Sequence, residues 1–120
     1  SVQMRRDSLI NPYGLAVEPV QQEIYVAQRG SAARSISIYD IANDQMKGAI
    51  AIGMEPHVLA LNPNNGHLFV AANDRVLVYG MRNGYAPLVS IMVPAGATEG
   101  MAVDTIHNTV YVASGDSDTI

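Results

Sequence analysis

Three histidines, His57, His67 and His107, have the widest chemical range of the side chains in this sequence. An imidazole can act as a general base near neutral pH or as a metal ligand. No cysteine is present, so a thiolate zinc site and a disulfide framework are both excluded. The segment Asp116-Ser117-Asp118 is acidic like a calcium loop, but it lacks the glycine and distal glutamate of an EF-hand. A plain polar loop is therefore the simpler interpretation of that segment.

Sequence motifs for other common chemistries are missing. The sequence contains no G-x-S-x-G, no G-x-x-x-x-G-K and no G-x-G-x-x-G. These patterns build a nucleophile elbow, a phosphate loop and a dinucleotide site, respectively. The six methionines lie mostly at expected strand ends and turns, where packing is their default role. Any function must therefore be inferred from the architecture that positions the polar residues.

Residues 57–72, HVLALNPNNGHLFVAA, contain two short apolar runs on either side of a turn. Short runs rich in Val, Leu and Phe indicate strands that are buried on both faces. Asn65-Gly66 lies between them and is a strong hairpin signal, because both residue types tolerate positive φ. Two further apolar runs follow. The predicted strands are 58–61, 68–72, 76–79 and 88–93.

The pattern of this segment occurs three times, at spacings of 44 and 42 residues. Each copy has small, aromatic and β-branched residues in the same order. A period of this length with four strands per unit is typical of propeller blades. We expect the aromatic residue of each copy to be buried between blades, and the last one to be less enclosed because its blade is incomplete. The aligned sets are Ala16, Ala60 and Ala102; Val17, Leu61 and Val103; Glu18, Asn62 and Asp104; Tyr25, Phe69 and Tyr111; Val26, Val70 and Val112; and Ala27, Ala71 and Ala113.

The rest of the chain also predicts strands, and no segment has the pattern of a long amphipathic helix. Residues 35–39, SISIY, alternate strictly and so predict a strand with one wetter face. The remaining expected strands are 14–17, 24–27, 46–52, 100–104 and 109–113.

Composition sets limits on the class of protein. Of the 120 residues, 48% are hydrophobic and 15% are charged, which indicates a globular chain. The net charge is −4 and there is no basic run, so nucleic-acid binding is not expected. No apolar run reaches the length of a membrane-spanning helix. Residues 1–10 do not form a visible signal peptide, although the missing initiator Met suggests a processed or excised chain. Absence of cysteine fits an extracellular or periplasmic location, which we expect, but it fits many cytosolic proteins too.

Three stretches resemble the YVTN and NHL β-propeller families: NPYGLAVEP with EIYVAQ, EPHVLALNP with HLFVAAN, and TEGMAVDTIHNTVYVAS. A YVTN blade reads approximately P-x-G-[LV]-A-[VL]-[DN]-P, then a turn, then [IV]-Y-V-A-N. The resemblance covers nearly the whole chain and implies an all-β fold of four-stranded antiparallel blades. We expect one partial propeller domain. Its parts are an outer strand of a preceding blade (1–10), two blades (11–53 and 54–95) and a partial blade (96–120).

The number of blades predicts an incomplete ring. Closed propellers typically have four to eight blades, and this chain has fewer than three. An open arc would leave apolar sheet faces uncovered. We therefore expect either self-association or continuation into a longer propeller chain.

The resemblance also implies that certain loops surround a central channel: those that lead into the inner strands and those between the second and third strands. His57 could act there as a base or ligand, with Glu99 as its carboxylate partner. The alternative interpretation is that these are variable polar loop positions. His67 and His107 would lie at the opposite end, which disfavours a histidine zinc site, so no metal and no cofactor are expected. The candidate ligand-binding residues are Tyr13, Arg29, His57, Asn73, Asp74 and Glu99, with Asp116 in a neighbouring loop.

Three functional hypotheses remain open. The first is a non-catalytic scaffold that presents channel-face loops to a protein, a carbohydrate or another small ligand. It rests on the clear repeat and the lack of convergent catalytic residues. The second is a fragment of a propeller enzyme of the lactonase or lyase type, because Pro56-His57 is similar to a Pro- and His-containing motif of some lactonase-type propellers. The arginine expected between those two residues is missing. The third is a minimal repeat segment without activity of its own.

Overall fold

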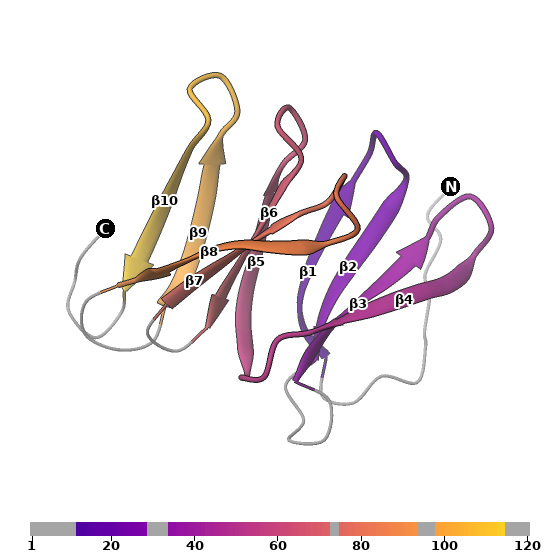
Figure 1. The fold of residues 1–120 in the computed structure, drawn as a ribbon, viewed down its shortest axis with the longest axis horizontal. Coiled ribbons are helices and arrows are strands. Elements are labelled where there is room, and N and C mark those ends of the chain that lie inside the picture. Colours follow the sequence, from indigo (N-terminus) through magenta and orange to yellow (C-terminus); the bar gives the residue numbers. More distant parts are fainter. Residues whose placement is uncertain (1–11, 29–33, 73–74, 94–97, 115–120) are drawn as a thin grey trace, which may run out of the picture.

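The computed structural model describes residues 12–28, 34–72, 75–93 and 98–114 (Figure 1). The described residues form ten strands and no helix, so the all-β prediction is confirmed. None of them forms a helix that could cross a membrane. The strands are β1 (Pro12–Glu18), β2 (Glu23–Gln28), β3 (Ser35–Asp40), β4 (Gln45–Ala51), β5 (Pro56–Asn62), β6 (His67–Ala72), β7 (Arg75–Gly80), β8 (Ala86–Met92), β9 (Thr98–Asp104) and β10 (Thr109–Ser114).

The strands form three antiparallel sheets, in the orders β1-β2-β3-β4, β5-β6-β7-β8 and β9-β10. The first strands of the sheets, β1, β5 and β9, are neighbours in space, and the sheets fan out from them (Figure 1). Each sheet is therefore a propeller blade with its first strand innermost. The described blades form an arc and do not close into a ring. The outer strand expected within residues 1–10 lies outside the described residues.

The turns between first and second strands repeat one geometry in all three blades. The residue before each second strand has a positive φ: 57° at Gln22, 73° at Gly66 and 53° at Asn108. Gly66 adopts this conformation without steric cost. Asn65 and Gly66 both tolerate positive φ, but the turn spans four residues and only Gly66 of the pair adopts it. A four-residue turn needs one left-handed residue, whereas the tighter two-residue turn needs two.

The last residue of each inner strand caps its turn. The Glu18 carboxylate accepts hydrogen bonds from the backbone N–H groups of Val20 and Gln21, at 3.2 and 2.5 Å. The equivalent Asn62 Oδ1 accepts from the Asn64 N–H at 3.0 Å. In the third blade Asp104 does the same for the two N–H groups that follow Thr105. An acceptor side chain at this position therefore satisfies turn donors that would otherwise lack a partner.

The aromatic residues of the first two copies pack against the following blade. Tyr25 belongs to a core cluster that joins the first two blades, and Phe69 to one that joins the second and third. The exposed fraction is 0% for Tyr25, 7% for Phe69 and 53% for Tyr111. Tyr111 is more exposed because no fourth blade covers it among the described residues.

The expectation of one wetter face on residues 35–39 was wrong. Ser35 and Ser37 are both buried, as are the alternating isoleucines of this strand. The Gln28 side-chain amide donates a hydrogen bond to the Ser37 hydroxyl. A polar side chain can be buried when its hydrogen bond is satisfied within the protein, and Ser37 meets this condition through Gln28.

Candidate functional site

The strand register brings the starts of the inner strands and the ends of the second strands to one end of the molecule. Pro12 pairs with Gln28, Pro56 with Ala72, and Thr98 with Ser114. The hairpin turns between first and second strands lie at the other end, at the top of Figure 1. We call the first of these ends the channel end, defined by the starts of β1, β5 and β9.

At the channel end, β1 and β5 approach each other closely. A Cβ atom placed on Gly14 would lie 3.2 Å from the His57 carbonyl oxygen. The backbones of Tyr13 and His57 are thus in adjoining strands, and the His57 side chain is half-buried. Glu99 belongs to β9, the next inner strand, so the three equivalent positions lie on successive neighbouring strands. Arg29, Asn73, Asp74 and Asp116 lie outside the described residues.

The other two histidines lie at the opposite end, beside the hairpin turns between first and second strands, as the repeat predicts. The rings of His67 and Phe69 meet edge to face with centroids 6.2 Å apart. His107 Nδ1 lies 2.6 Å from a carboxylate oxygen of Asp104. This hydrogen bond lowers the pKa of Asp104. Within the described part of the chain, no three His, Asp or Glu side chains gather as a metal site would require.

A buried carboxylate at the boundary of the first two blades is the most concentrated polar cluster among the described residues. Glu23 is buried at the start of β2. Its carboxylate accepts hydrogen bonds from the hydroxyl of Tyr25 at 2.6 Å and from that of Tyr85 at 2.8 and 2.9 Å. Lys47 of β4 forms an ion pair with the same carboxylate. Two strands of the first blade, β2 and β4, and one turn of the second blade therefore converge on Glu23.

The ionisation of this cluster follows from its contacts. Burial opposes ionisation of Glu23, but hydrogen bonds from Lys47, Tyr25 and Tyr85 outweigh it and lower its pKa. Burial, reinforced by the nearby Glu23 carboxylate, raises the pKa values of Tyr25 and Tyr85. The hydrogen bond to Glu23 raises the pKa of Lys47. Near neutral pH the cluster thus holds an ionised carboxylate, an ammonium group and two neutral phenols.

Sequence reasoning did not find this cluster. Glu23 stands where the other copies have His67 and Thr109, and Lys47 is the only lysine of the chain. These two departures from the repeat were the features of the sequence that could have indicated the cluster. Nothing in the sequence linked them to Tyr85, which lies in the turn between β7 and β8 of the next blade.

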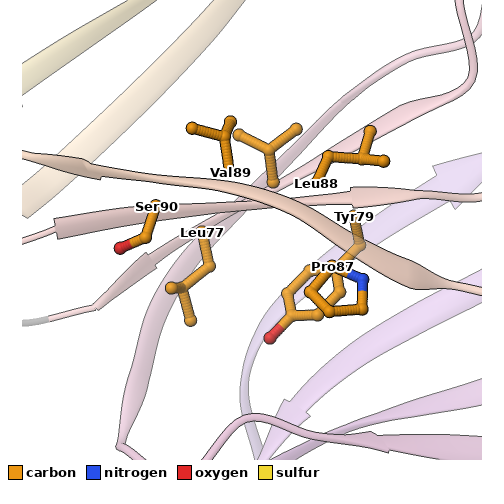
Figure 2. Close-up of a pocket in the computed structure, with 7 residues that line it drawn as sticks. Leu77, Tyr79, Pro87, Leu88, Val89 and Ser90 are labelled. Carbon is orange, nitrogen blue, oxygen red and sulfur yellow. The ribbon is translucent and has the colours of Figure 1, made fainter.

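A shallow apolar groove of about 200 Å³ lies between β7 and β8 (Figure 2). Tyr79 and Ser90 carry its polar side-chain atoms, and the other lining residues are apolar: Leu77, Val78, Pro87, Leu88 and Val89. Figure 2 shows Leu77, Tyr79 and Ser90 on one side of β8 and Leu88 and Val89 on the other. The groove therefore lies along β8, the outermost strand of the second blade, and does not include the starts of the inner strands at the channel end.

Comparison with known proteins supports the fold. No family model matches the chain, and no curated protein matches it. Among solved structures, hydrazine synthase from Kuenenia stuttgartiensis matches with a TM-score of 0.78 and 21% identity, over 94% of this chain and 32% of that one. A gluconolactonase from Xanthomonas campestris matches with a TM-score of 0.74 and 19% identity, over 91% of this chain and 36% of that one.

The four-stranded sheets and these neighbours define the chain as part of a β-propeller. It spans about a third of the length of each neighbour. Identities near 20% establish the fold alone, and a fold does not fix a function. The assignment to YVTN or NHL repeats remains a prediction from the motifs.

Proposed function

We propose that this chain is a non-catalytic propeller scaffold that binds a protein or carbohydrate ligand through its channel end. The observation that supports this most is the structural use of its buried carboxylates. Glu18 caps its own turn, and Glu23 joins two blades. Both carboxylates therefore have structural roles, and the proposal assigns recognition to side chains at the channel end.

His57 is the residue at the channel end that is best placed to contact a ligand. It is half-buried on the central one of the three inner strands, with β1 on one side and β9 on the other. A partly enclosed imidazole can both stack on a sugar face and hydrogen-bond a hydroxyl group. Arg29, Asn73, Asp74, Tyr13 and Glu99 are the other residues that the proposal assigns to this surface.

Binding can be tested on a glycan array with the 120-residue chain. His57→Ala is the test variant, and His107→Ala is the matched control because His107 lies in a turn at the opposite end. The proposal expects glycan binding that His57→Ala reduces at least about tenfold, the effect of losing one good contact of about 1.4 kcal/mol, and that His107→Ala leaves intact. Binding that both variants reduce equally would contradict a site at the channel end.

A propeller enzyme of the lactonase type is the second candidate. It is favoured by Pro56-His57 at the start of β5 and by the fold shared with a gluconolactonase. The measurement is hydrolysis of glucono-lactone by the wild-type chain, with and without added divalent metal. Turnover above background that His57→Ala abolishes would support the enzyme and replace the scaffold proposal.

A further inference from the structure

Two asparagine–glycine pairs, Asn65-Gly66 and Asn83-Gly84, lie in hairpin turns of the second blade. Asparagine is a thermolabile residue, and a following glycine increases this lability. The backbone nitrogen of the glycine can attack the carbon of the side-chain amide, and glycine has no Cβ atom to obstruct the approach. Each pair can react only where the nitrogen and the amide are both free of other partners.

The first pair is held in place by its turn. The Gly66 N–H donates a hydrogen bond to the Asn62 carbonyl oxygen at 2.9 Å. The side-chain oxygen of Asn65 accepts a hydrogen bond from the His67 N–H at 3.2 Å. Gly66 is also buried. Both reacting groups of this pair are therefore occupied, and attack would require the turn to open.

The second pair has neither restraint. Asn83 and Gly84 are both exposed. The Gly80 carbonyl oxygen accepts hydrogen bonds from the N–H groups of Asn83 and Tyr85, at 3.1 and 3.0 Å, whereas the Gly84 N–H has no acceptor among the described residues. The side-chain amide of Asn83 likewise forms no hydrogen bond within the described part of the chain. The nucleophile and the amide of this pair are therefore both available to react.

The corresponding turn of the first blade shows what the second turn lacks. It follows β3, which is the third strand of its sheet as β7 is of the next. Asn43 follows Asp40 at the same spacing as Asn83 follows Gly80. The Asp40 carboxylate accepts hydrogen bonds from the backbone N–H and the side-chain amide of Asn43, at 3.3 and 3.0 Å. Gly80 has no side chain that could hold Asn83 in this way, so the second turn leaves its asparagine unrestrained.

We propose that Asn83 is a site of spontaneous deamidation, with the backbone nitrogen of Gly84 as the nucleophile. This nitrogen loses its proton and forms a bond to Asn83 Cγ, while the side-chain nitrogen takes up a proton and leaves as ammonia. Water then opens the resulting cyclic imide at one of its two carbonyl carbons. One product is aspartate. The other is isoaspartate, in which the main chain runs through the former side chain and is one methylene group longer.

Both products alter the turn that carries Tyr85. The φ of Tyr85 is 61°, which is an unusual conformation for a bulky residue, and its hydroxyl donates a hydrogen bond to Glu23 across the blade boundary. Deamidation adds a negative charge two residues before Tyr85, and isoaspartate also lengthens the turn that the Gly80 carbonyl closes. The modification should therefore weaken the contact between Tyr85 and Glu23.

This inference goes beyond the proposed ligand site and does not depend on it. Arg82, in the same turn, donates a hydrogen bond to the Pro63 carbonyl oxygen in the turn between β5 and β6. The modified turn therefore lies at the end of the blades opposite the channel end.

The first measurement is peptide mapping of the 120-residue chain during incubation in mildly alkaline buffer. Cleavage after glutamate gives one fragment, 56–99, that contains both asparagine–glycine pairs, and another, 24–55, that contains Asn43. Fragmentation in the mass spectrometer should locate the change from amide to acid at Asn83 first. The rate there should exceed that at Asn65 at least about tenfold, which corresponds to a difference in barrier of about 1.4 kcal/mol.

The variant Gly84→Asp tests whether the nitrogen of residue 84 is the nucleophile. Asp44, at the same position counted from β3, has a φ of 58°, so a turn of this kind accepts an aspartate there. The added side chain crowds the attacking nitrogen and should slow deamidation of Asn83 at least about tenfold. Gly53→Asp is the matched control, because Gly53 also has a positive φ and nothing lies within 4 Å of its added Cβ. It should leave the rate at Asn83 unchanged.

The second measurement is urea denaturation of fresh and deamidated protein. The chain deamidated at Asn83 should unfold at a lower urea concentration than the fresh chain. This shift should be smaller in Tyr85→Phe, which lacks the hydroxyl that contacts Glu23. Asn83→Gln is the control for the incubation itself, because its longer side chain forms the cyclic imide much more slowly, and it should show no shift.

Each part of the inference has its own contrary result. An unmodified Asn83, deamidation of Asn65 at an equal rate, or an unchanged rate in Gly84→Asp overturns the assigned site. Deamidation of Asn83 that leaves the urea midpoint unchanged, or shifts it equally in the wild type and in Tyr85→Phe, overturns the link to the blade boundary.

Discussion

The Tyr85 hydroxyl donates a hydrogen bond to the Glu23 carboxylate at 2.8 Å, across the boundary between the first and second blades. The same two blades also meet where the rings of Tyr25 and Tyr85 pack edge to face, with centroids 6.2 Å apart. The carboxylate thus ties a turn of one blade to the second strand of the other. This hydrogen bond adds a directional contact to the apolar packing between the two sheets.

Removing the hydroxyl of Tyr85 should weaken this boundary. Tyr85→Phe leaves the buried carboxylate with one donor fewer, so the free energy of unfolding should fall by about 1.5–3 kcal/mol, the usual contribution of a hydrogen bond to a charged group. Urea denaturation measures this loss. Tyr79→Phe is the matched control, because burial alone raises the pKa of Tyr79. Equal losses in the two variants would show that the Tyr85 bond contributes nothing specific.

Glu23 should make the protein less stable in acid. Its pKa is lowered from 4.5 on folding, so the stability it provides is present above pH 4.5 and is lost as the pH falls through the lower folded value. Glu23→Gln should therefore flatten the decline of the unfolding free energy below pH 4.5. The pKa of Asp104 is lowered in the same direction, so Asp104→Asn is measured alongside to separate its contribution. A wild-type stability that does not change between pH 5 and pH 2 would contradict the charge state assigned to Glu23.

Phe69 should contribute strongly to stability because it is enclosed by two blades. Phe69→Ala should lower the unfolding free energy by about 3–5 kcal/mol, as for other buried aromatic residues. The control Ile106→Ala removes an exposed side chain and should change stability by no more than about 0.5 kcal/mol. Chemical denaturation of both variants gives the comparison. A loss below about 1 kcal/mol for Phe69→Ala would mean that its side chain is not seated between the blades.

Gly14 should tolerate a methyl group poorly. An added Cβ would lie 3.2 Å from the His57 carbonyl oxygen, and backbone cannot move aside as a flexible side chain can. We expect Gly14→Ala to cost about 1–3 kcal/mol through overpacking. Gly48→Ala is the control, because nothing lies within 4 Å of its added Cβ. Thermal unfolding that places the two variants at the same midpoint would contradict the close approach of β1 and β5.

The blade pattern was predictable from sequence because it depends on local periodicity repeated three times. Short apolar runs and turn residues fix each strand, and the spacing of 44 and 42 residues fixes the equivalence of Tyr25, Phe69 and Tyr111. The dry polar face of β3 was not predictable, since alternation alone does not reveal that Gln28 hydrogen-bonds Ser37. Alternation reports the polarity of a face but not whether its polar groups find partners.

The polar cluster at Glu23 was hidden for a related reason. Its members are far apart in sequence and come from two blades, so their meeting depends on how the sheets stack. The repeat predicts that three of the candidate ligand-binding residues, Tyr13, His57 and Glu99, occupy equivalent positions in successive blades. Their placement on adjoining strands was therefore predictable from the sequence. The roles of their side chains depend on loop conformation, which periodicity does not determine.

The central claim is that Tyr25 and Phe69 each pack against the first and second strands of the next blade, and proton nuclear Overhauser effects measure this most directly. A spectrum of the 120-residue chain should show cross-peaks from the Phe69 ring to the methyl groups of Met101, Val103 and Val112. It should show cross-peaks from the Tyr25 ring to the methyl groups of Leu59 and Val70. A spectrum in which Phe69 contacts none of the third-blade methyl groups would contradict the stacked-blade architecture.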